Sequence, residues 1–97
     1  MFRKLFGKSK FLKHLNTLME VYSCSQNAQS TYHELERLKP LARTDGEKAL
    51  YELNRAALLY DMKKYREAAD VIVEIPSVNP EFDASCAAVK TKIMNAL

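Results

Sequence analysis

The sequence predicts an all-α fold of about five helices arranged as antiparallel hairpins. Three observations lead to this prediction. Apolar residues recur at the helical period of about 3.6 residues through most of the chain. The 97 residues include two glycines and three prolines, too few for a turn-rich β protein. Apolar residues also return at one constant spacing in two parts of the chain, which is typical of arrays of helical hairpins.

The first two helices are expected between residues 9 and 40. A helix over about 9–23 would place six apolar residues on one face: Phe11, Leu12, Leu15, Leu18, Met19 and Tyr22. A second helix would carry a shorter apolar stripe: Ala28, Tyr32, Leu35 and Leu38. Pro40 follows this stripe and is expected to stop the second helix, because proline disfavours the helical conformation of the residue before it.

The third helix is expected from about Asp45 to Met62. Thr44 followed by Glu47 is the pattern of a capping box at its start. One apolar face would be formed by Ala49, Leu50, Leu53, Ala56, Ala57 and Tyr60, and another by Tyr51, Leu58 and Met62. A helix with two apolar faces is usually packed between neighbours. The second face is either covered by the first two helices or left open as a binding groove.

The fourth and fifth helices complete the expected fold. Lys63 and Lys64 are expected to form a short turn before the fourth helix, and Pro76 is expected to end this helix. Its core-facing residues would be Tyr65, Ala68, Ala69, Ile72 and Ile75. Asn79 is a suitable N-cap for the fifth helix, with Pro80 at its first position. The fifth helix carries a narrower stripe: Phe82, Cys86, Val89, Ile93 and Leu97.

Two helix pairs are related by a constant offset of 40 residues, for example 68 minus 28. Ala28, Tyr32, Leu35 and Pro40 match Ala68, Ile72, Ile75 and Pro80 in this way. Residues 49–80 resemble a tetratricopeptide repeat, most clearly in Tyr65-Arg66-Glu67-Ala68 and in Asn79-Pro80 at the family's spacing. Residues 12–40 resemble a more degenerate copy. The resemblance implies a right-handed array of hairpins with the fifth helix as a C-terminal cap; a generic bundle of four or five helices is the alternative.

The resemblance also implies a concave groove lined by the first helix of each hairpin. The candidate groove residues in this chain are Lys13, Thr17, Leu50, Leu53, Asn54, Ala57, Tyr60 and Asp61. Some members of the family hold a C-terminal carboxylate with a clamp of lysine and asparagine. Lys13 and Asn54 stand at two clamp positions, whereas Thr17 replaces a clamp asparagine. Ordinary solvated side chains are the alternative interpretation of these residues.

No combination of residues for catalysis, metal binding or cofactor binding is apparent. Cys24 and Cys86 are isolated, and neither forms a catalytic or zinc-binding pattern with His14 or His33. Gly7 and Gly46 are the only glycines, so a glycine-rich phosphate loop is excluded. We therefore expect a protein that is not an enzyme and that needs no cofactor or metal. The two lone cysteines are expected to be reduced and partly buried.

The N-terminal residues 1–8 form a basic amphipathic arm, and residues 9–97 are expected to form one helical domain. The arm supplies the candidates for contact with a membrane or a partner: Phe2, Arg3, Lys4, Leu5, Phe6 and Lys8. Apolar residues among cations are typical of a weak anchor at an anionic membrane surface. The arm could equally dock on the body of the protein or on another chain.

These observations lead to a functional hypothesis. We expect a protein–protein interaction module, an adaptor or chaperone-like protein, that binds a peptide or helix of a partner. The alternative is a peripheral membrane-surface protein held by residues 1–8. A homodimer would supply the stacking that two repeats lack. The net charge of +3 is low for a nucleic-acid binder. The expected location is the cytoplasm, with a peripheral position at the membrane as the alternative.

Overall fold

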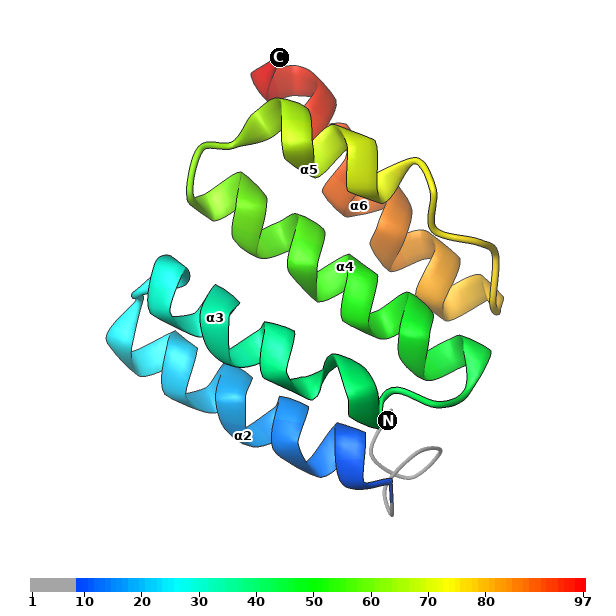
Figure 1. Ribbon diagram of the computed structural model, residues 1–97. Helices are drawn as coiled ribbons and strands as arrows, with labels where there is room; N and C mark the ends of the chain where they lie inside the picture. The colour runs from blue at the N-terminus through cyan, green and yellow to red at the C-terminus, as the bar shows by residue number, and fades with distance from the viewer. Residues whose placement is uncertain (1–8) are drawn as a thin grey trace.

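The computed structural model describes residues 9–97 and contains five α-helices (Figure 1). They are α2 (Lys10–Ser25), α3 (Ala28–Leu38), α4 (Asp45–Asp61), α5 (Tyr65–Ile72) and α6 (Pro80–Ala96), with a short 3₁₀ helix, η1 (Lys39–Leu41), after α3. Within residues 9–97 there is no β-strand. The predicted all-α fold of about five helices is therefore confirmed.

Helix α4 lies at the centre of the molecule. Figure 1 shows α2 and α3 on one side of α4, and α5 and α6 on the other. Each helix packs against the next one in the sequence, and α6 also packs against α4. The short connections between successive helices explain this order, because short loops make sequential helices antiparallel neighbours.

Two hydrophobic clusters hold the helices together, and α4 contributes to both. In the first cluster Phe11 of α2, Leu35 of α3 and Leu58 of α4 are completely buried. In the second, Ala56 of α4, Ala68 of α5 and Ile93 of α6 are completely buried. Burial of a large aliphatic or aromatic side chain contributes about 1.5–3 kcal/mol. Helix α4 is thus fixed from two sides.

The structure settles whether the second apolar face of α4 is covered. Tyr51 is 4% exposed and Leu58 is 0% exposed, because α2 and α3 pack over them. Met62 is half-buried beside the second cluster. The line formed by these three residues is therefore part of the core and offers no open groove.

Polar caps fix where the helices begin. The predicted capping box is present: Glu47 N–H donates to Thr44 Oγ1 (3.1 Å), and Glu47 Oε1 accepts from the Thr44 N–H (3.3 Å). Ser9 Oγ accepts from Leu12 N–H (3.1 Å) at the start of α2. Burial alone would raise the pKa of Glu47, but hydrogen bonds from Ser9, Arg43 and Thr44 lower it. Glu47 therefore connects the beginnings of α2 and α4 as a carboxylate.

Two local details differ from the sequence-based expectations. Helix α5 ends at Ile72, so Ile75 lies half-buried in the linker to α6 instead of on the helix. The Ile75–Pro76 pair explains this, because a residue before proline is driven out of the helical region. Helix α3 ends at Leu38, before Pro40, as expected, and Pro40 lies within the 3₁₀ helix that follows. Cys24 is exposed, and only Cys86 is partly buried.

The alanines of α4 provide a test of this packing. Ala56 is completely buried between α4, α5 and α6, whereas Ala57 beside it is half-buried. Ala56→Leu should lower the free energy of unfolding by about 1–3 kcal/mol, because a closely packed site has no room for the added atoms. Urea denaturation measures this value. Ala57→Leu is the matched control and should change it by less than about 0.5 kcal/mol; equal losses would contradict the proposed packing.

Candidate functional site

The candidate site is the inner face of α4, defined here as Leu50, Asn54, Ala57 and Asp61. These residues recur at intervals of four, three and four, so they form one row along the helix. The first three are half-buried and Asp61 is exposed. The row lies between the sides of α4 that enter the two hydrophobic clusters, so it remains accessible from solvent.

The two ends of the inner face have different neighbours. At its N-terminal end, Leu50, Leu12 of α2 and Phe82 of α6 line a cavity of about 10 Å³, which is enough for about one water molecule. At its C-terminal end Tyr22 of α2 donates a hydrogen bond from its hydroxyl to Asp61 Oδ2. The row is therefore closed by apolar packing at one end and crossed by a polar contact at the other.

The environment of Tyr22 keeps its hydroxyl protonated. Burial, followed by the hydrogen bond to Asp61 and its negative charge, raises the pKa of Tyr22 from 10.0 to about 12. The neutral hydroxyl is the form that can donate to the carboxylate. Tyr22 and Asp61 thus form a fixed polar bridge from α2 to α4.

Helix α6 borders the other side of the inner face. The Tyr60 ring lies 5.4 Å from the Tyr65 ring, and Lys92 Nζ lies 6.0 Å above the Tyr60 ring centre. A cation at this distance from an aromatic face is weakly attracted to it. The inner face therefore has an acidic group on the α2 side and a basic group on the α6 side.

The structure places the predicted groove residues in two groups. The candidates on α4 either form the inner face or lie beside it: Leu50, Leu53, Asn54, Ala57, Tyr60 and Asp61. Lys13 and Thr17 are exposed on α2, where the Thr17 hydroxyl donates to the Lys13 carbonyl (3.1 Å). Asn54 Nδ2 donates to the Leu50 carbonyl (2.9 Å). A carboxylate clamp formed by Lys13, Thr17 and Asn54 stays a prediction.

The candidates in the N-terminal arm lie outside the described residues. These are Phe2, Arg3, Lys4, Leu5, Phe6 and Lys8. Within residues 9–97, no helix combines the length and the apolar character needed to cross a membrane. In the same part of the chain, no group of three His, Cys, Asp or Glu residues is arranged to hold a metal ion.

A concave region lies on the side of α4 opposite to the inner face and was not predicted from the sequence. This outer hollow has a volume of about 540 Å³ and lies between α4, α5 and the linker to α6. Its lining consists of Asp45, Lys48, Ala49, Glu52, Arg55, Asp70, Val71, Glu74, Ile75, Pro76, Ser77 and Val78. Lys48, Glu52 and Arg55 form a polar line on α4, which is the one sequence signal that could have indicated this side.

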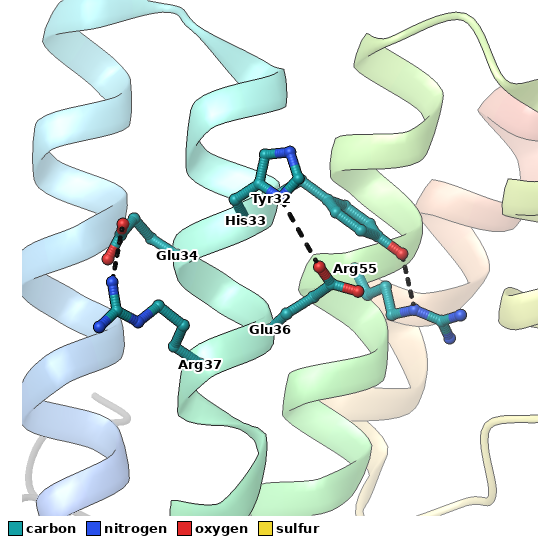
Figure 2. A network of polar contacts seen from close by, with 6 residues as sticks. All are labelled: Tyr32, His33, Glu34, Glu36, Arg37 and Arg55. Atoms are coloured by element: carbon teal, nitrogen blue, oxygen red, sulfur yellow. Dashed lines mark hydrogen bonds and ion pairs between the residues drawn. The ribbon is translucent and has the colours of Figure 1, made fainter.

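Arg55 joins the edge of the outer hollow to α3. Its Nε donates to Tyr32 Oη (3.1 Å), and its Nη1 donates to Glu52 Oε1 (2.8 Å). Burial would lower the pKa of Arg55, but the bonds to Tyr32 and Glu52 raise it. Figure 2 shows Tyr32 reaching across to Arg55. The pairs His33–Glu36 and Glu34–Arg37 on α3 are more than half exposed and contribute little to stability.

Asp83 holds the linker that forms one wall of the outer hollow. Its Oδ1 accepts from Val78 N–H (3.0 Å), and its Oδ2 accepts from the Ser77 hydroxyl. These two bonds lower the pKa of Asp83. Asn79 Oδ1 accepts from Phe82 N–H (2.8 Å) and caps α6 directly after the linker. The path of residues 75–79 is thus tied to the first turn of α6.

Residues 9–97 thus form an all-α fold with a hollow on one side of α4. Comparison with known proteins adds no relative: no family model, curated protein or solved structure matches the chain.

The Tyr22–Asp61 bridge predicts a stability change at alkaline pH. Tyr22→Phe should lower the free energy of unfolding by about 1 kcal/mol at pH 8. The folded pKa of Tyr22 is raised, so its contribution is complete below pH 10 and is lost as the pH rises towards about 12. Urea denaturation of both proteins should show their difference shrinking over this interval. A difference that is independent of pH would contradict the bridge.

The contacts of Asp83 predict a local effect on the linker. Asp83→Ala should accelerate amide hydrogen exchange of Val78, because the bond that protects this amide is removed. Glu81→Ala, in the same turn of α6, is the control and should leave the exchange rate unchanged. In the unmodified protein the NMR chemical shift of the Val78 amide should report the ionisation of Asp83. The midpoint of this titration should lie below the ordinary pKa of aspartate, because the hydrogen bonds to Asp83 lower its pKa. A midpoint at or above about 3.9 would contradict this contact.

Proposed function

We propose that this protein is a non-catalytic interaction module that holds a peptide or helix of a partner protein on the inner face of α4. The observation that carries the proposal is the row formed by Leu50, Asn54, Ala57 and Asp61, which remains accessible although α4 is packed on two other sides. Rows at this spacing are what a docked helix or peptide uses for recognition.

The composition of the row indicates what kind of segment would fit. Ala57 at its centre is small, so a partner backbone can approach closely there. Asn54 uses its amide nitrogen inside α4, which leaves its amide oxygen as an acceptor for the partner. Asp61 and Lys92 place opposite charges towards different sides of the row. The ligand is thus a segment with small apolar residues and a polar flank.

A tetratricopeptide-like arrangement is part of this proposal. The helix contacts support this arrangement. Helix α2 packs against α3, and α4 packs against α5. Helix α6 follows this second hairpin and packs against both α4 and α5. In such an array the first helices of the hairpins line the concave side. Helices α2, α4 and α6 accordingly surround the inner face. The right-handed sense of the array and the role of α6 as a cap belong to the same proposal.

The cysteines are consistent with a binding role in a reducing compartment. Cys24 and Cys86 are both free thiols, which supports a cytoplasmic location. Burial, followed by the charge of Asp83, raises the pKa of Cys86 and disfavours its nucleophilic thiolate. An adaptor or chaperone-like protein is therefore the function that we assign.

Selection of ligands from a peptide library tests the proposal. The purified protein should select peptides whose affinity falls at least about tenfold, or 1.4 kcal/mol, in Ala57→Arg, because the long cation blocks the centre of the row. Fluorescence anisotropy measures the dissociation constants. The control is Glu20→Arg, an exposed substitution on α2, which should change them by less than about twofold.

Two results would refute the assignment. One is the absence of any selected peptide. The other is equal affinity of the unmodified protein and a folded Ala57→Arg variant. Circular dichroism establishes that the variant is folded, and Ala57→Ser serves as a second, smaller change that should weaken binding less than Ala57→Arg.

A further inference from the structure

The outer hollow has the size and the lining of a docking site for a short segment of chain. Its volume of about 540 Å³ lies within the range of ordinary ligand pockets. Part of its wall is apolar and formed by Ala49, Val71, Ile75, Pro76 and Val78. The wall formed by the linker is held in place by the contacts of Asp83. The hollow can therefore bury apolar side chains.

The charge of the outer hollow selects for a basic segment. Four carboxylates and two cations line it, giving a net charge of −2. One of the carboxylates, Glu52, is already paired with Arg55. Among residues 9–97, Asp45, Asp70 and Glu74 form no ion pair. These three carboxylates leave negative charge for an incoming ligand to neutralise.

The first eight residues of this chain have the complementary chemistry. They contain Arg3, Lys4 and Lys8 and no acidic residue. They also contain three large apolar residues for the apolar walls: Phe2, Leu5 and Phe6. We infer that residues 1–8 dock in the outer hollow of their own chain.

The geometry at the beginning of α2 makes docking within one chain feasible. Ser9, the residue next to the arm, caps α2, and Leu12 in the same turn lines a small cavity together with Glu47 in the first turn of α4. The hollow begins at Asp45 in the same turn. The segment must pass around one helix, whose diameter with side chains is about 10–12 Å. Half the circumference of such a helix is about 17 Å and eight extended residues reach about 26 Å, so about three residues, Met1 to Arg3, can reach into the hollow.

Docking in this place has two physical consequences. Phe2 would bury apolar surface against the walls, and Arg3 would approach Asp70 and Glu74. The attraction is between partly exposed charges, so it weakens as salt is added. The occupied surface lies on the side of α4 opposite to the inner face, so it is independent of the proposed partner site.

A spin label on the arm tests the inference in the full chain. Leu5→Cys is combined with Cys24→Ser and Cys86→Ala, so that the nitroxide is attached at one position. NMR spectra of the ¹⁵N-labelled protein should show selective loss of intensity at the amides of Ala49 and Val71 and of the linker that lines the hollow. Loss confined to the beginning of α2, or no selective loss, would overturn the inference.

Charge-reversal variants test the complementarity directly. Asp70→Lys combined with Glu74→Lys should restore the lost intensity at Ala49 and Val71, because both carboxylates line the hollow. Glu20→Lys combined with Glu34→Lys is the matched control on α2 and α3, and should leave the loss unchanged. All four positions are exposed, so the fold should persist in both variants, and the amide spectrum verifies this. Equal behaviour of the two variants would overturn the inference.

Mixed samples separate docking within one chain from exchange between copies. Spin-labelled protein without ¹⁵N is mixed with ¹⁵N protein without the label, and no loss at the hollow should appear. Loss in the mixed sample would assign the arm to a second copy and would overturn the intramolecular inference.

Amide hydrogen exchange tests the inference without a spin label, so it does not depend on the folding of the cysteine variants. Arg3→Glu combined with Lys4→Glu should accelerate amide hydrogen exchange at residues 70–78 of the full chain, because the arm leaves the hollow. Unchanged exchange in this segment would contradict docking.

Discussion

The structure depends on the burial of α4 from two opposite sides. Leu58 lies in the cluster with α2 and α3, and Ala56 lies in the cluster with α5 and α6, and both are completely inaccessible to solvent. Within residues 9–97, the pair α2 and α3 and the pair α5 and α6 each pack their apolar faces against α4. A substitution that moves α4 must therefore disturb both clusters together, and the molecule is expected to unfold as one unit.

A helix that is buried on two sides retains two strips facing solvent, and here these strips have different chemistry. The inner face has a small residue, Ala57, at its centre and the Tyr22–Asp61 bridge at one end. The outer strip is polar and is joined to α3 through Arg55 and Tyr32. Within residues 9–97, Asp45, Asp70 and Glu74 beside the outer strip form no ion pair, and the proposed docking of the basic residues 1–8 rests on this.

The accuracy of the sequence-based predictions follows from the range of the interactions involved. The start of α4 was predicted correctly because Thr44 and Glu47 are three residues apart and form their contacts within one turn. The start of α6 was correct for the same reason. The end of α5 was wrong. The stripe extended to Ile75, but the backbone follows Pro76 and the contacts of Asp83, which the stripe does not reveal.

From the sequence alone follow the all-α fold with about five helices in residues 9–97 and the starts of α4 and α6. Helical periodicity and capping are local effects, so the order of residues is sufficient to predict them. Only the tertiary structure decided which faces of α4 are covered. It also joined Tyr22 to Asp61 and Tyr32 to Arg55, which are 39 and 23 residues apart. Such contacts depend on the distances and angles between packed helices, and the order of residues along one helix does not contain them.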